Sequence, residues 1–405
     1  MARTSSRSRS RSTRSSRNSG SRTRRRTGNG SRRSASPRMD RKIRYAVIGL
    51  GHIAQVAVLP AFRHAARNSE LAALVSDDPK KLKQLGKQYR VDRLLGYDEL
   101  DELYRSGEID AVYIALPNHL HAQYTIQAAR AGMHVMCEKP MAVTSEECER
   151  MMGACRSARV KLMIAYRLHF ERANLEAAEM AKSGKLGELR YFDSIFSYQV
   201  QEDSIRTNPE DEGGGPLYDI GVYCINTARY LMGAEPTSVL ATSIPRPDDG
   251  RFQEAPETVS AILQFPDRRV GTFTCSFGSA DTGSYDVIGT KGHLRMDPAY
   301  EYSEDLAYEV KIGERTRKKQ LGKSDQFAPE LLYFSDCVRQ NREPEPSGQE
   351  GLADVRIIEA IRRASRSGKR EAVQVEQRSK RPTLRQEIRK PGVDKPKTVN
   401  VQQPH

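Results

Sequence analysis

The chain of 405 residues has no tryptophan, only six cysteines, and no apolar run near the ~20 residues that a membrane-spanning helix needs. The cysteines are scattered, with neither the pairing of a disulfide scaffold nor the spacing of a zinc site. We therefore expect buried thiols in a reducing compartment and no bound metal. No apolar stretch follows the arginine-rich start, so a secretory signal is not expected. Together these absences predict a cytoplasmic protein without a membrane segment.

Acidic residues are absent from residues 1–39, which contain thirteen arginines. The whole chain has 66 Lys and Arg against 52 Asp and Glu, a net charge of +14. Residues 366–405 hold eleven bases and four acids, which leaves 42 bases and 48 acids for residues 40–365. Because the basic charge lies in two tails, a basic nucleic-acid groove across the folded body is disfavoured. Nucleic acid is expected to bind, if at all, only through residues 1–38.

Residues 1–38 repeat Arg and Ser and have almost no apolar side chain to bury, which predicts disorder. This segment has two interpretations. It is either a tail that contacts nucleic acid or is switched by phosphorylation, or a solvated extension joined upstream of a true start at Met39. We favour the second interpretation, because Met39 leads directly into the first expected strand.

Short apolar runs alternate with helical patterns over residues 39–165, and the runs fall at residues 45–48, 71–75, 111–116, 134–137 and 161–165. This alternation predicts an α/β fold with an N-terminal Rossmann domain, a doubly wound parallel sheet. Over residues 166–377 the strand-like runs mostly follow one another without helices, at residues 189–200, 238–244, 258–265, 270–277, 285–288 and 306–312. We expect a C-terminal α+β domain there, with an open, mainly antiparallel sheet. Residues 378–405 are polar and are predicted to form a loosely packed arm.

A glycine-rich turn, Gly49-Leu50-Gly51-His52-Ile53-Ala54, stands between the first strand and a helix expected over residues 53–67. Gly49 permits the tight turn, and Gly51 lets backbone N–H groups approach a pyrophosphate. The motif alone is weak, but its place in a strand–turn–helix unit makes it specific. It predicts a dinucleotide cofactor.

The end of the second strand distinguishes NADP from NAD. An NAD enzyme usually places an acid there for the ribose 2′-hydroxyl. This chain has Ser76 at that point, followed by Lys80 and Lys81, and these side chains suit a 2′-phosphate. The alternative is that Asp77 or Asp78 takes the ribose role one or two positions later. We favour NADP, with NAD as the alternative.

Polar residues with catalytic chemistry occur at two further places. Lys139 follows a buried strand at its carboxyl end, where doubly wound sheets bind ligands. On a helix expected from Pro216 onward, Asp219, Tyr223 and Asn226 fall at i, i+4 and i+7 and share one stripe. That face can point into a cleft between the two domains. The alternative is an ordinary amphipathic helix with a solvated polar face.

Three segments carry a family resemblance: the glycine-rich turn, the stretch from Gly132 to Glu138-Lys139-Pro140, and Gly213-Gly214-Gly215 with the helix that follows. The chain resembles the Gfo/Idh/MocA oxidoreductases over about residues 43–369. It looks nearest to the branch of glucose-fructose oxidoreductase and aldose or dihydrodiol dehydrogenases, since Tyr223 stands where inositol dehydrogenases carry histidine. The resemblance implies that Tyr97 lies over the adenine, and that the cofactor is held by Gly49, Gly51, His52, Ile53, Ser76, Lys81, Leu116, Asn118, His121, Glu138 and Arg167.

The resemblance also places Lys139 in the active site. Oxidation of a sugar hydroxyl needs a base, and a free tyrosine with a pKa of ~10 is a poor one unless a nearby ammonium favours the phenolate. We expect Tyr223 to be the general acid/base, Lys139 to tune it, and Asp219 to orient hydroxyls or relay the proton. The predicted activity is NADP-dependent oxidation of an aldose to its lactone, or the reverse on a carbonyl. Alternatives are a polyol or trans-dihydrodiol dehydrogenase and a non-catalytic NADP sensor.

Two expectations concern partners and cofactor retention. An open sheet face needs covering, which predicts a homodimer or homotetramer. Glucose-fructose enzymes can carry a proline-rich arm that embraces the cofactor, and residues 1–38 do not resemble it. A dehydrogenase that releases NADPH is therefore as consistent with the sequence as a permanently loaded enzyme.

Overall fold

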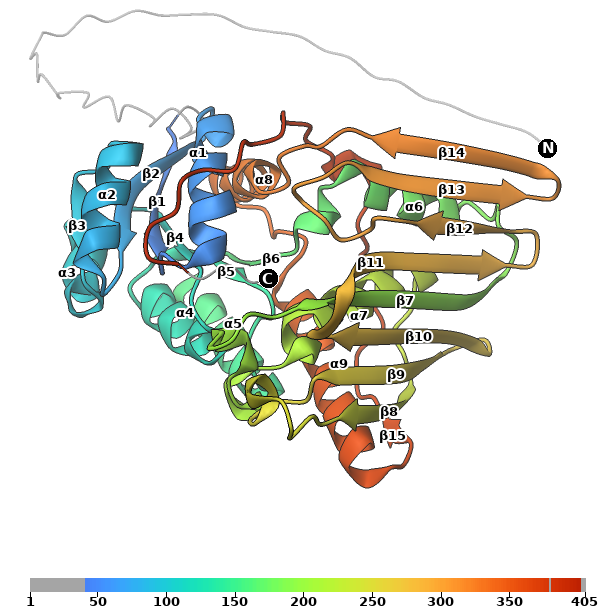
Figure 1. Ribbon diagram of the computed structural model, residues 1–405. Helices are drawn as coiled ribbons and strands as arrows, with labels where there is room; N and C mark the ends of the chain where they lie inside the picture. The colour runs from blue at the N-terminus through green and yellow to red at the C-terminus, as the bar shows by residue number, and fades with distance from the viewer. Residues whose placement is uncertain (1–40, 379, 402–405) are drawn as a thin grey trace, which may run out of the picture. The chain divides into compact units, whose positions relative to one another are not determined.

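A computed structural model describes residues 41–378 and 380–401, and the strands in this part of the chain form two sheets (Figure 1). The expectation of disorder for residues 1–38 lies outside the described residues. None of the described helices combines the length and apolar character that a bilayer crossing requires.

The first sheet has six parallel strands in the order β3-β2-β1-β4-β5-β6, as the alternation predicts. Strand order reverses between β1 and β4, and ligands bind at such a reversal, outside the carboxyl ends of the strands. The strands are β1 (Ile43–Ile48), β2 (Ser69–Val75), β3 (Arg93–Leu95), β4 (Ala111–Ile114), β5 (His134–Glu138) and β6 (Leu162–Ala165).

Both faces of this sheet are covered, because alternate residues of β1 pack into different cores. Tyr45 and Val47 pack with residues of helices α1 and α8, whereas Ala46 and Ile48 belong to the cluster that includes α4 and α5. The helices here are α1 (Leu59–Ala65), α2 (Pro79–Tyr89), α3 (Leu100–Ser106), α4 (His121–Arg130), α5 (Ser145–Ala158) and α8 (Ala328–Arg339). The helix expected over residues 53–67 begins instead with the π-helical turn η1 (Ala54–Val58).

The second sheet has nine strands in the order β14-β13-β12-β11-β7-β10-β9-β8-β15. Among the described strands of this second sheet, only β7 and β10 pair in parallel. The sheet is therefore mainly antiparallel, as predicted. The strands are β7 (Leu189–Gln199), β8 (Ser238–Ile244), β9 (Thr258–Phe265), β10 (Arg269–Ser276), β11 (Gly278–Gly289), β12 (Gly292–Met296), β13 (Leu306–Ile312), β14 (Arg315–Leu321) and β15 (Glu371–Ala372).

Helices α6 (Arg172–Lys182), α7 (Val222–Met232) and α9 (Gly348–Ser367) lie on one face of this sheet (Figure 1). The other face is open, and Ile195 and Ile262 on it are 39% and 46% exposed. The sequence patterns did not predict β3, β12, β14 or α3, which are short or mostly polar elements, and they also did not predict α6.

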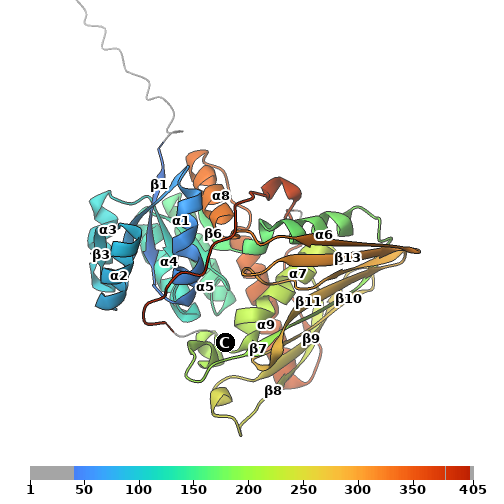
Figure 2. The same cartoon turned by 45° about the horizontal axis from the view of Figure 1, so that its top comes forward.

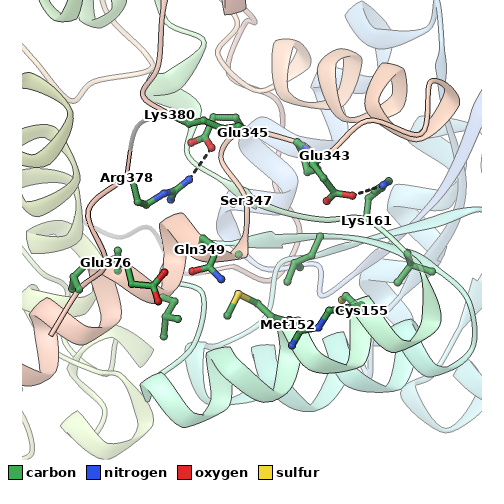
Figure 3. Close-up of a pocket in the computed structure, with 18 of the residues that line it drawn as sticks. Met152, Cys155, Lys161, Glu343, Glu345, Ser347, Gln349, Glu376, Arg378 and Lys380 are labelled. Atoms are coloured by element: carbon green, nitrogen blue, oxygen red, sulfur yellow. Dashed lines mark hydrogen bonds and ion pairs between the residues drawn. The ribbon is translucent and has the colours of Figure 1, made fainter. Parts of the chain in front are cut away.

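The C-terminal arm, residues 378–401, contacts the rest of the chain more closely than its polar composition predicts. At its start, Arg378 pairs with Glu345 and Glu350 beside a cavity of about 770 Å³ (Figure 3). Further on, the arm runs past α1 toward the first sheet (Figures 1 and 2). At these points charged residues of the arm meet buried acids, and composition does not show those partners.

Candidate active site

The glycine-rich turn has the geometry that a phosphate-binding turn needs. Gly49 has φ +93°, and a Cβ there would lie 2.4 Å from the Ala115 carbonyl oxygen, so only glycine fits. A Cβ on Gly51 would meet no atom within 4 Å, so this glycine leaves space beside the turn. His52 and Ile53 follow it and lead into η1. The residues present therefore fit a dinucleotide pyrophosphate.

The end of β2 carries the residues expected to select the cofactor. Ser76 is buried, and its Oγ accepts a hydrogen bond from the Asp78 backbone N–H at 3.2 Å. Asp78 caps α2, because its Oδ1 accepts from the backbone N–H groups of Lys80 (2.8 Å) and Lys81 (3.1 Å). A hydrogen bond from Asn400, together with these N–H groups, lowers the pKa of Asp78. Its carboxylate is thus occupied by protein donors, which weakens the alternative that it holds a ribose hydroxyl.

Lys139 lies directly after β5, and its ammonium is fixed by a carboxylate. Its Nζ donates to the backbone oxygen of Asp219 at 2.8 Å and to Oδ1 of the same residue at 3.1 Å. The side chain of Lys139 is 12% exposed. Burial lowers the pKa of Lys139, but the charge of Asp219 and the neighbouring Tyr223 outweigh burial and raise it. Lys139 is therefore a cation.

Asp219 lies in the π-helical turn η7 (Leu217–Gly221) before α7 and accepts hydrogen bonds from three side chains. Besides Lys139, its Oδ2 accepts from Arg206 Nε and from the Tyr198 hydroxyl, both at 2.9 Å. Burial raises the pKa of Asp219, but Lys139 and Arg206 outweigh it and hold that pKa well below its usual value. Asp219 is therefore an ionised anchor for two cations. This geometry does not favour the proton-relay role suggested from the sequence.

Tyr223, in the first turn of α7, lies between two cations. The ammonium of Lys139 and the guanidinium of Arg167 are each 4.9 Å from its ring centroid. Arg167 Nε also donates to the Tyr223 hydroxyl oxygen at 3.1 Å, so Arg167 contacts the oxygen and Lys139 lies over the ring. Arg167 is fixed in turn by Gln326 Oε1 at 2.5 Å and by the Tyr300 carbonyl. The structure thus brings Lys139, Asp219, Tyr223 and Arg167 together.

Asn226 does not join this group, which corrects the expected stripe. Its amide donates to Glu350 and Asp354, and its oxygen lies 2.8 Å from the ring of His169, all in a buried network. Every residue of α7 except Tyr223 is buried, so this helix has no solvated polar face on which a stripe could lie.

The remaining predicted cofactor residues lie around the carboxyl ends of β4 and β5. Asn118 donates to the Gly213 carbonyl at 2.8 Å, which links the first domain to the segment before η7. Glu138 accepts from the Tyr113 hydroxyl at 2.7 Å. The ring nitrogens of His121 each lie 2.9 Å from a backbone carbonyl, those of Leu116 and Pro140, so His121 braces this loop.

Three further predicted residues, His121, Tyr97 and Lys81, can be placed in the structure, and two residues near Asp219 were not predicted. Burial lowers the pKa of His121 to about 4, which fits a structural role for the neutral ring. The ring of Tyr97 is tilted by 56° against that of Tyr124, with ring centroids 5.6 Å apart, and Lys81 lies in the first turn of α2. Arg206 and Tyr198 were missed, because the loop after β7 brings Arg206 to Asp219 and the sheet places Tyr198 of β7 there.

Comparison with known proteins agrees with this fold. The profile described as "Oxidoreductase family, NAD-binding Rossmann fold" (Gfo/Idh/MocA) matches residues 43–166, and the Gfo/Idh/MocA C-terminal domain matches residues 174–295. D-xylose 1-dehydrogenase [NADP(+)] of Haloarcula marismortui is 32% identical, with 80% of this chain and 92% of that protein covered. Mouse trans-1,2-dihydrobenzene-1,2-diol dehydrogenase is 28% identical, with 80% and 96% covered.

Solved structures show the same similarity. The aldose-aldose oxidoreductase of Caulobacter crescentus, complexed with glycerol, is 38% identical with a TM-score of 0.78, over 82% of this chain and 100% of that chain. KijD10, a 3-ketoreductase from Actinomadura kijaniata in complex with TDP-benzene and NADP, is 26% identical with a TM-score of 0.70, over 79% and 97%.

Proposed function

The chain belongs to the Gfo/Idh/MocA oxidoreductase family, and on that premise we propose that it transfers hydride between a sugar and NADP. The substrate class follows from its relatives, which include an NADP-dependent D-xylose dehydrogenase and an aldose-aldose oxidoreductase. The reaction oxidises an aldose at its anomeric carbon to a lactone, or runs in reverse on a carbonyl. The bound nicotinamide supplies the hydride acceptor or donor.

The observation that carries the proposal is Tyr223 between Lys139 and Arg167, at the carboxyl ends of the parallel strands. As hydride leaves the sugar carbon, the proton of the hydroxyl on that carbon must also leave. The phenol oxygen of Tyr223 takes this proton as general base and returns it in the reverse direction. Arg167 Nε donates to this oxygen at 3.1 Å and so orients the phenol.

The other residues position this pair and hold the cofactor. Asp219 fixes the ammonium of Lys139, which is then available to the substrate oxygen. The turn at Gly49 and Gly51 would hold the pyrophosphate, and Ser76 with Lys81 would hold the 2′-phosphate. NADP is favoured over NAD on these residues and on the NADP dependence of the relatives.

The open face of the second sheet supports a homo-oligomer. Ile195 on β7 and Ile262 on β9 are exposed on this face, beside hydroxyl side chains that pair across strands, such as Ser260 with Thr274 at 2.7 Å. A second copy of the chain would remove the exposed apolar side chains from water.

The test of the function is a spectrophotometric assay at 340 nm of purified protein with a panel of aldoses, polyols and a trans-dihydrodiol. We expect NADP+ reduction with at least one aldose and a lower kcat/KM with NAD+. Reduction of NADP+ only with polyols or the dihydrodiol would contradict an aldose as the substrate. No reduction of NADP+ with any substrate would contradict an enzymatic function.

A further inference from the structure

The last described residues of the C-terminal arm lie against the glycine-rich turn. The backbone N–H of Val399 donates to Gln55 Oε1 at 2.7 Å, and Gln55 Nε2 donates back to the Val399 carbonyl at 3.0 Å. Gln55 Nε2 also donates to the Leu50 carbonyl at 2.8 Å, within the turn itself. Val399 and Gln55 are both buried. Gln55 therefore ties the arm directly to the backbone of the turn.

One residue further along, the arm contacts the other side of the expected adenosine site. Asn400 Nδ2 donates to Asp78 Oδ2 at 3.0 Å. Asp78 is the cap of α2, and its backbone N–H donates to Ser76 Oγ. The arm thus reaches the group of residues, at the end of β2, that is expected to hold the 2′-phosphate.

The turn after β1 and the end of β2 are the two sides between which a Rossmann domain holds the adenosine half of its cofactor. Val399 and Asn400 are consecutive, and each binds one of these sides. We propose that residues 399–400 are part of the cofactor site: they join its two sides and slow the release of NADP. The inference rests on the proposed function, because it takes NADP as the ligand.

The arm is anchored well before it reaches the cofactor turn. Arg378 pairs with Glu345 (Figure 3) and with Glu350. Arg381 pairs with Glu235 at 2.7 Å. Later, the carbonyl of Lys390 accepts from the Asp325 backbone N–H at 3.2 Å, and Pro391 forms a bridge with Ser324. Because the arm is held at Pro391, residues 392–400 can detach and rebind without unfolding of the domain. They act as a strap on a fixed anchor.

The strap also affects the charge at the 2′-phosphate position. A free carboxylate at Asp78 would repel a phosphate, as the acid at this point does in NAD enzymes. Here the backbone N–H groups of Lys80 and Lys81 occupy one oxygen of Asp78, and the Asn400 amide occupies the other. Loss of Asn400 should therefore weaken binding of NADPH more than binding of NADH. A purely structural role of the arm would not change this ratio.

The experiment compares the full chain with a truncation that removes residues 398–405, the substitution Asn400→Ala, and a control truncation that removes only residues 402–405. Each protein is loaded with NADPH, and the loss of nicotinamide fluorescence is followed after mixing with excess NADP+. We expect release about tenfold faster without residues 398–405, equivalent to about 1.4 kcal/mol, and unchanged release in the control. The ratio of the Kd for NADPH to that for NADH should rise in Asn400→Ala.

Equal release rates for the full chain and the longer truncation would overturn the inference, and so would slower release from the truncation. If the truncated chain does not fold, Asn400→Ala provides the test. An unchanged release rate together with an unchanged ratio of the Kd for NADPH to the Kd for NADH in this variant would also overturn the inference. Failure of the proposed function looks different, because then the full chain itself would bind neither NADPH nor 2′,5′-ADP in calorimetry.

Discussion

The substitution Asp219→Asn distinguishes an anchor for Lys139 from a proton relay. It keeps the shape of the side chain but leaves two cations, Lys139 and Arg206, without their carboxylate. The side chain of Lys139 is 12% exposed, that of Arg206 24% and that of Asp219 23%, so solvent screens their interaction only in part. Removing one partner of a largely buried ion pair typically costs 3–5 kcal/mol. Because the backbone oxygen of Asp219 still accepts from Lys139 Nζ, we expect a loss of about 3 kcal/mol in the free energy of unfolding.

The pH dependence of this loss carries the test. Asp219 has a folded pKa below its unfolded value, so its contribution is fully present above the unfolded pKa and is lost as pH falls toward the folded one. The difference between the two proteins in urea unfolding should therefore stay constant from pH 8 to pH 5. It should narrow only below about pH 3.9, the ordinary pKa of an aspartate.

A difference below 1 kcal/mol at pH 7, or one that shrinks between pH 7 and pH 5, would refute this reasoning. If Asp219 relayed protons, its carboxyl group would titrate between pH 7 and pH 5. Asp267→Asn is the matched control, because Asp267 is 85% exposed and pairs with Arg269 at 3.4 Å; it should lose little, since exposed ion pairs contribute about 0–1 kcal/mol.

Three further predictions concern Glu330 and the two glycines of the glycine-rich turn. The carboxylate of Glu330 is buried without a hydrogen-bond partner among the described atoms, and burial raises its pKa well above the usual value. The folded pKa of Glu330 lies above its unfolded pKa, so Glu330 lowers the free energy of unfolding as pH rises beyond about 4.3. In urea unfolding, Glu330→Gln should be more stable than the natural chain at pH 8 and equally stable at pH 4. Gly49→Ala should fail to fold or lose several degrees in Tm, because its Cβ would meet the Ala115 carbonyl at 2.4 Å. Gly51→Ala should keep its Tm and lose NADPH affinity in a fluorescence titration, and equal affinity would contradict the pyrophosphate role of that turn.

Much of the fold follows from local pattern. Short runs such as Ala111–Ile114 are apolar throughout because a parallel strand is covered on both faces, and helical stretches alternate with them. Short or polar elements are not visible in this way: β14, with the sequence Arg315–Leu321, is mostly charged and lies at an edge of its sheet, where water solvates its side chains.

The catalytic group was only partly predictable. Spacing on one helix brings Asp219 near Tyr223, but it also placed Asn226 with them, which is wrong because α7 is buried on all sides except at Tyr223. Arg206 reaches Asp219 from a loop thirteen residues earlier, and the periodicity of a helix or a strand cannot predict a contact between such segments. The strap was missed for the same reason, since the pairing of Val399 with Gln55 spans 344 residues.

The most direct test of the central claim is a single-turnover measurement of NADP+ reduction by an aldose in Tyr223→Phe, with Tyr89→Phe on α2 as the matched control. General acid–base catalysis contributes about 10²–10⁴-fold to a rate. We expect a fall of that size for Tyr223→Phe with the Kd for NADPH unchanged, and a normal rate for the control. A Tyr223→Phe rate within a few-fold of the natural chain would contradict the role of Tyr223 as the acid/base.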